Sequence, residues 1–127
     1  MSELTCLILS VLLWVAHVLV QAGTSQVALP LTWLFSARDM PTPPRGLVYG
    51  RATRALANYV ENFTAFAALD LAFIATHQSG GWGPTIWIVA RILYLPLYLF
   101  NVVYVRSIAW GISLVAVLMM VARLTWS

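Results

Sequence analysis

The sequence predicts an all-α integral membrane protein, a four-helix transmembrane bundle, and its composition carries that prediction. Hydrophobic residues make up 61% of the 127 residues and charged residues only 9%, which excludes an ordinary soluble domain of this length. A helix needs about 20 apolar residues to span the bilayer hydrocarbon, so the chain has room for four spans with short connections. We therefore expect one transmembrane domain over residues 1–127.

Four helical segments are predicted, at residues 4–22, 46–76, 85–100 and 105–125. Gly23 and the prolines after it predict a connection over residues 23–46, with only a short interfacial piece around Trp33 and Phe35. The second helix is long enough to protrude from the membrane before entering it. The stretch "HQSGGWGP" predicts the turn between the second and third helices.

The arginines predict the orientation in the membrane. The connection between the first two helices and the start of the second helix hold Arg38, Arg45, Arg51 and Arg54, and Arg106 lies between the third and fourth helices. By the positive-inside rule both regions face the cytoplasm, which places both termini on the other side. Arg123, near the chain end, argues mildly against this orientation.

A polar stripe runs along the start of the second predicted helix. Residues three and four apart share one helical face, and this face carries Arg51, Arg54, Asn58, Glu61 and Asn62. Ionisable groups at membrane depth are costly unless they are paired or face water, so the stripe should face the bundle interior or a subunit interface. One hypothesis is an Arg54–Glu61 salt-bridge network that only holds helices together, and the other is a ligand pocket.

A second polar face follows in the third predicted helix, where Arg91, Tyr94 and Tyr98 recur at intervals of three and four. Arg106 then opens the last helix, where its guanidinium joins backbone N–H groups and the positive end of the helix dipole, a combination that attracts anions. Each tyrosine alone also fits an interfacial belt. Together with the first stripe, these residues would form a pocket of cations, amides, phenols and one carboxylate.

These motifs resemble the family of membrane-associated proteins in eicosanoid and glutathione metabolism (MAPEG). The family's second-helix pattern R-A-x-x-N-x-x-E appears as "RALANYVE", from Arg54 to Glu61. Its later pattern of an arginine, two tyrosines and a further arginine appears as Arg91, Tyr94, Tyr98 and Arg106. Both patterns occur in order, so the resemblance covers nearly the whole chain, and "RILYLPLY" followed by "RSIAW" is similar to the small bacterial members.

The resemblance implies a left-handed bundle assembled as a homotrimer, with glutathione as cosubstrate between neighbouring subunits near the cytoplasmic side of a bacterial inner membrane. The implied ligand residues are Arg51, Arg54, Asn58, Glu61, Asn62, Tyr94 and Tyr98. Arg106 would stand beside the sulfur as the catalytic residue, because a guanidinium favours the nucleophilic thiolate. The implied activity is a transferase or peroxidase acting on a lipophilic electrophile or hydroperoxide from the bilayer. Neither a metal nor a nucleic-acid partner is expected.

The sequence also departs from the glutathione-using members. Several of them carry a basic residue near the end of the first helix, where this chain offers His17 and Gln21, and position 56 is leucine. A different thiol therefore stays open. So does a non-catalytic lipid-binding scaffold of the same family. A small multidrug transporter is disfavoured, because it would need a carboxylate deep in the first helix and the predicted first span has none after Glu3.

Three further residues receive structural interpretations. Cys6 is expected to be a small apolar filler, and His17 a buried histidine hydrogen-bonded to a neighbour. Asp70 and Arg91 each lie ten or so residues from the turn near Gly80, roughly 15 Å along a helix. If the helices form an antiparallel hairpin, this predicts a structural Asp70–Arg91 ion pair near mid-membrane.

Overall fold

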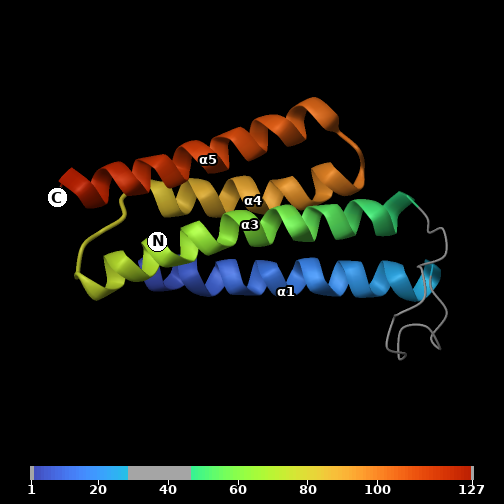
Figure 1. The fold of residues 1–127 in the computed structure, drawn as a ribbon, viewed down its shortest axis with the longest axis horizontal. Coiled ribbons are helices and arrows are strands. Elements are labelled where there is room, and N and C mark those ends of the chain that lie inside the picture. The colour runs from blue at the N-terminus through green and yellow to red at the C-terminus, as the bar shows by residue number, and fades with distance from the viewer. Residues whose placement is uncertain (1, 29–46, 127) are drawn as a thin grey trace.

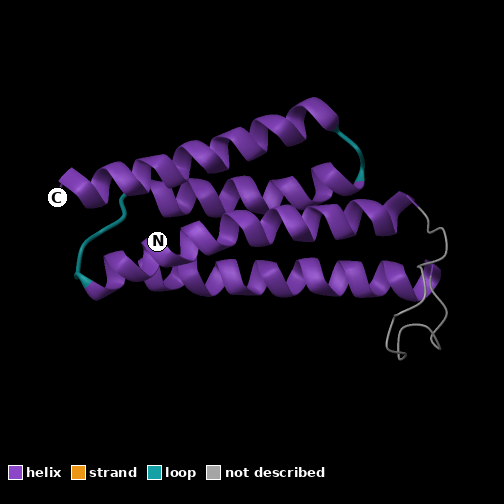
Figure 2. Ribbon diagram, viewed as in Figure 1, coloured by secondary structure: helices purple, strands orange, loops and turns teal. Residues whose placement is uncertain are grey.

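The fold is all-helical throughout the part of the chain that the computed structural model describes, residues 2–28 and 47–126. Its helices are α1 (Glu3–Ala28), α3 (Leu47–Ala75), α4 (Gly83–Leu99) and α5 (Val103–Trp126). These described residues include no strand (Figure 2). The predicted all-α class and all four predicted helices are therefore confirmed.

The helices lie side by side along one long axis (Figure 1). α1 packs mainly against α3, and α5 packs mainly against α4. The start of α1, the connection between α3 and α4 and the end of α5 lie toward one end of the bundle, and the turn between α4 and α5 lies at the other. We call these the loop end and the turn end.

The first helix continues beyond its predicted boundary and ends at Ala28 rather than residue 22. Interior glycine costs a helix only about 1 kcal/mol, and the next residue fits into the helix. The hydroxyl of Thr24 donates to the carbonyls of Val20 at 2.8 Å and Gln21 at 3.0 Å. The expectation that Gly23 breaks the helix is therefore wrong, whereas the piece predicted around Trp33 and Phe35 lies outside the described residues.

Aromatic side chains form the centre of the bundle. Phe66 of α3 stacks on Trp87 of α4 with ring centroids 4.0 Å apart and planes inclined by only 6°. Tyr59 precedes Phe66 by two helical turns on α3, and its ring centroid lies 5.7 Å from that of the same indole. The Tyr59 hydroxyl donates a hydrogen bond to the carbonyl of Ser10 on α1. This aromatic column ties α1, α3 and α4 together by offset-stacking and tilted contacts that each add to simple burial.

His17 and Cys6 have structural surroundings, as expected. The His17 ring is buried and stacks on Tyr59 at 4.5 Å, while its Nδ1 lies 2.8 Å from the carbonyl oxygen of Leu13 on the same helix. Cys6 is a fully buried free thiol in the core cluster that contains Phe66 and Trp87. Both side chains therefore serve packing between α1 and α3.

The predicted Asp70–Arg91 ion pair does not form. Arg91 lies level with Asn58, to whose Oδ1 its Nη1 donates at 2.9 Å. Asp70 follows Asn58 in α3 by about three helical turns, so it lies at the depth of a point about three turns before Arg91. α4 begins only about two turns before Arg91, and Figure 1 shows α3 extending beyond the start of α4. The prediction assumed that α3 ends and α4 begins at the same depth in the bundle. Instead, residues 76–82 connect an end of α3 and a start of α4 that lie at different depths. Asp70 is buried with neither carboxylate oxygen hydrogen-bonded within the described residues.

Two helices are long and apolar enough to cross a membrane, with spans at Glu3–Thr24 and Val103–Trp126. Large apolar side chains are exposed along both, and on α5 they include Ile108, Ile112, Val115 and Leu118. Apolar surface of this extent suits lipid or another subunit rather than water. α4 is a shorter apolar helix, and α3 carries the polar stripe at its start.

Gly83 lies where α4 and α5 pack too closely for a larger side chain. A Cβ at this position would lie 2.7 Å from Cγ of Met120 and 3.2 Å from the carbonyl oxygen of Ala116. At Gly111 of α5, by contrast, no heavy atom counted among the described residues lies within 4 Å of the equivalent Cβ. Small residues that let helix backbones approach closely are typical of helix packing in membranes.

We therefore expect Gly83→Ala to lower stability by about 1–3 kcal/mol through overpacking. Gly111→Ala should leave stability unchanged or raise it by up to about 1 kcal/mol, because it removes glycine's entropic cost in a helix. Unfolding monitored by circular dichroism in detergent would compare the two variants. Equal midpoints for both variants would contradict a close Gly83 contact.

Asp70→Asn tests the absence of the ion pair. The substitution removes a buried charge whose oxygens have no partner among the described residues, so we expect the unfolding midpoint to stay the same or rise. A fall comparable to the loss of a buried ion pair, about 3–5 kcal/mol, would show that Asp70 is paired after all.

Candidate functional site

Arg91 lies at the centre of the candidate site and is completely buried. Its guanidinium carbon lies 4.2 Å from the ring centroid of Tyr94 and 5.3 Å from that of Tyr59, so two aromatic faces stabilise the charge. Because arginine carries only donors, the contact with Asn58 holds the amide oxygen toward Arg91 and leaves Nδ2 as the donor of Asn58. Arg91 therefore sets the orientation of a side chain that lines the neighbouring pocket.

A polar pocket of about 260 Å³ lies between α3, α4 and α5. The four sequence-predicted residues that line it are Asn58, Tyr94, Tyr98 and Arg106. They come from three helices, and the tyrosine rings lie 5.6 Å apart on one face of α4. In the view of Figure 1, α5 inclines away from α4 toward the turn end. Arg106 lies near the start of α5, at that end.

Tyr98 connects two arginines at this pocket. The guanidinium carbon of Arg106 lies 4.4 Å from the Tyr98 ring centroid, and Nε of Arg54 donates to the Tyr98 hydroxyl at 3.2 Å. Arg106 is half-buried in the first turn of α5, where the helix dipole adds positive potential. The Arg54–Glu61 network considered from the sequence is not what holds Arg54, whose hydrogen bond runs to α4 instead.

The other predicted site residues lie around the pocket rather than on its wall. Nη1 of Arg51 donates to the carbonyl of Leu99 at 3.1 Å and so binds the C-terminus of α4, where a cation is favourable. Asn62 donates to the backbone carbonyl of Asn58 at 3.3 Å. Glu61 is exposed. The single chain therefore gathers cations, an amide and phenols, while its carboxylate points elsewhere.

Glu61 belongs to an exposed face of α3. This face, at helical intervals of three and four, consists of Arg54, Ala57, Glu61, Thr64, Ala68 and Leu71. Asn58 is level with Arg91, which lies halfway along α4. Glu61 follows Asn58 by about one helical turn, toward the loop end of the bundle. A carboxylate at such depth is costly against lipid, so this face requires a polar or protein environment.

Ser107 and Trp110 also line the pocket, although the sequence analysis did not select them. Trp110 follows Arg106 by four residues, a spacing that places both on one helical face. That spacing could have identified Trp110. Ser107 had no comparable signal, because residues next to each other in a helix point in different directions.

The arrangement suits an anionic ligand. Arg106 lines the pocket, Arg54 contacts one of its side chains and Arg91 contacts two, while no carboxylate of the described residues lines it. Arginines bind carboxylates with charge-assisted hydrogen bonds, and a guanidinium beside a thiol favours the thiolate. Asn58 and the two phenols supply neutral polar groups between the cations.

An all-helical chain with exposed apolar helices and a cationic pocket between three of its helices is typical of a membrane protein. A model of the MAPEG family matches residues 4–126, and the chain belongs to this family. The predicted family resemblance is thereby confirmed. Comparisons with curated proteins and with solved structures gave no match.

The two asparagines of α3 test the central contact. Asn58→Ala removes the amide oxygen that Arg91 contacts, and we expect it to lower stability by about 1.5–3 kcal/mol, the range for hydrogen bonds to charged groups. Asn62→Ala should change stability by less than about 0.5 kcal/mol, because the hydrogen bond of its amide goes to a backbone carbonyl of its own helix. Thermal unfolding in detergent measures both, and equal losses would contradict the role given to Arg91.

Proposed function

We propose that this protein is a membrane-embedded, glutathione-dependent transferase or peroxidase. Arg106 would stabilise the glutathione thiolate, which attacks a lipophilic electrophile or hydroperoxide. In transfer, the sulfur supplies the electron pair of the new carbon–sulfur bond and the leaving group departs with the pair of the broken bond. With a hydroperoxide, the thiolate attacks the terminal oxygen, the O–O bond breaks and the alcohol leaves. A second glutathione then reduces the resulting sulfenic acid, which gives glutathione disulfide and water. The observation that carries this proposal is the position of Arg106 in a pocket shared with Asn58, Tyr94 and Tyr98.

The charge of the ligand fits the charge of the pocket. Glutathione carries two carboxylates and one ammonium at neutral pH, so its receptor needs more than one cation, donors between them and one acceptor. Arg54, Asn58 and the two tyrosines would hold the peptide, with Arg51 at its outer edge. Asn62 would support Asn58 from the following turn of α3.

Assembly as a homotrimer would complete this site. Within one chain Glu61 lies on the exposed face of α3, and a neighbouring subunit packed there would remove the carboxylate from lipid. The small side chains of Ala57, Thr64 and Ala68 on the same face suit close helix packing. Glu61 could then meet the glutathione ammonium at the subunit interface.

We propose that all four helices cross the membrane, with both termini on the non-cytoplasmic side of a bacterial inner membrane. An even number of spans agrees with the described chain ends, which lie toward the same end of the bundle (Figure 1). Arg51, Arg54 and Arg106 all lie toward the turn end, which the positive-inside rule assigns to the cytoplasm.

An apolar groove supports the alternative function of a lipid-binding scaffold. It has a volume of about 270 Å³, lies between α4 and α5, and includes Trp82, Val89, Leu93 and Ile112 among its lining residues. A groove of this chemistry would accept the tail of a lipid, whether as substrate or as a bound ligand. The two functions differ in whether the protein ionises a thiol.

A titration with glutathione near neutral pH tests the proposal through the ultraviolet absorbance of the thiolate. We expect a saturable thiolate signal with the detergent-purified wild-type protein, and its loss in Arg106→Ala because the stabilising cation is gone. Arg106→Lys should keep part of the signal, since it keeps the charge but not the planar fork. Gly111→Ala, also on α5, serves as the control and should match the wild type.

Folded wild-type trimers without a thiolate signal would contradict a glutathione-activating function. Repeating the titration with other low-molecular-weight thiols then separates a different cosubstrate from the scaffold, which should bind lipid without ionising any thiol.

A further inference from the structure

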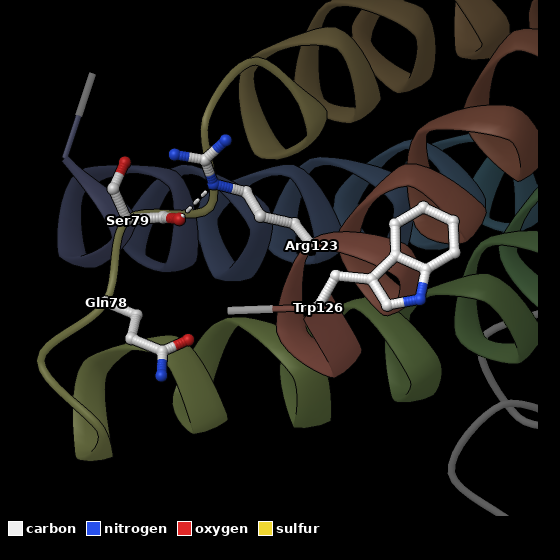
Figure 3. A pocket seen from close by; sticks show the side chains of 4 residues that line it. All are labelled: Gln78, Ser79, Arg123 and Trp126. Atoms are coloured by element: carbon white, nitrogen blue, oxygen red, sulfur yellow. Dashed lines mark hydrogen bonds between the residues drawn. The ribbon is translucent and has the colours of Figure 1, made fainter.

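A second pocket, of about 500 Å³, lies at the loop end of the bundle (Figure 3). It is lined by Gln78 and Ser79 from the connection between α3 and α4, and by Arg123 and Trp126 from the last turns of α5. None of these residues takes part in the proposed thiol chemistry. The pocket is therefore separate from the proposed thiol site.

The loop backbone binds one edge of the Arg123 guanidinium. Its Nε donates to the carbonyl of Ser79 at 2.6 Å, and Figure 3 shows the two terminal nitrogens directed away from this bond. The flat guanidinium lies against Gly81, where a Cβ would come within 3.2 Å of Cζ, and Gly81 has a φ of 67°. The loop conformation thus orients the planar group while leaving its terminal N–H donors for another partner.

The carboxylate of Glu3, at the start of α1, is engaged by the loop backbone. Oε1 of Glu3 accepts a hydrogen bond from the backbone N–H of Gly80 at 2.7 Å. Glu3 therefore anchors the start of α1 to the loop, and Arg123 anchors the end of α5 to the adjacent carbonyl. No carboxylate of the described residues forms an ion pair with Arg123, so its positive charge can meet the anionic group of a ligand.

The surroundings of the pocket match the headgroup level of a bilayer. Trp126 is 87% exposed and Trp82 is 74% exposed, and tryptophan is enriched at membrane interfaces. Leu118 and Val121, which precede Arg123 on α5, are exposed apolar residues of the same long apolar helix. A ligand with a phosphate at the pocket and acyl chains along α5 would contact both regions.

We propose that the loop-end pocket binds the phosphate of a phospholipid headgroup, with the terminal nitrogens of Arg123 on the phosphate oxygens. Guanidinium forms paired, charge-assisted hydrogen bonds with phosphate. Gln78 and Ser79 supply polar groups for the headgroup substituent beyond the phosphate. The bound lipid would fasten the loop and the end of α5 to the membrane surface, independently of the chemistry at Arg106.

The experiment titrates the detergent-purified full chain with dioctanoyl phosphatidylglycerol and follows amide hydrogen exchange of residues 76–82. Dioctanoylglycerol has the same chains without phosphate, and inorganic phosphate supplies the anion without chains. We expect saturable slowing with the phospholipid, little effect of dioctanoylglycerol, and binding of inorganic phosphate that is weaker by at least about tenfold, because the acyl contacts are absent.

Three variants test the assigned contacts. Arg123→Gln should raise the phospholipid concentration at the titration midpoint by at least about tenfold, the loss of affinity expected for charge-assisted hydrogen bonds. The midpoint of Arg123→Lys should lie between those of Arg123→Gln and the wild type. Glu3→Gln keeps an oxygen acceptor for Gly80 but removes a negative charge, so the midpoint should stay unchanged or tighten. Midpoints, rather than absolute exchange rates, are compared because Arg123→Gln also loses its bond to Ser79.

Three results would overturn the proposal. An equal response to dioctanoylglycerol would show an apolar site that ignores the headgroup. Equal midpoints in wild type and Arg123→Gln would show that Arg123 does not hold the phosphate. Inorganic phosphate acting at the same concentration as the phospholipid would show a small-anion site without a lipid.

Discussion

The burial of Arg91 is the constraint on which the rest of the site depends. A guanidinium inside a membrane bundle is costly unless its charge and donors are met. The rings of Tyr59 and Tyr94 and the amide oxygen of Asn58 meet them in part. These contacts set the depth of α4 against α3. That register brings Tyr98 to Arg54 and the end of α4 to Arg51.

The same register explains why the two ends of the bundle differ. At the turn end, α5 leaves α4 at an incline and carries Arg106 over the Tyr98 ring, which opens a polar pocket between helices. At the loop end, the helix termini converge on residues 76–82, where Glu3 and Arg123 bind neighbouring backbone groups. One end therefore surrounds a pocket with a cationic side chain, and at the other end the loop and the helix termini close the bundle.

The exposed face of α3 connects the single chain to its environment. Arg54 and Glu61 both lie on it, among small residues, and neither belongs against acyl chains. Arg54 is tied to α4 through Tyr98, whereas Glu61 has no comparable contact from α4. The chemistry of this face therefore agrees with a subunit interface, and a site shared between subunits would give both charges a polar setting.

The sequence by itself determined the helical class, the family and the residue types at the site, because apolar composition and the spacings three and four are local properties of the chain. It grouped Asn58, Tyr94, Tyr98 and Arg106, which line one pocket in the structure. Local spacing does not determine the depth at which one helix meets another. Only the tertiary structure decided that Arg91 contacts Asn58 rather than Asp70, that Gly23 lies within α1, and that Glu61 faces outward, because helix register follows from side-chain packing across the bundle.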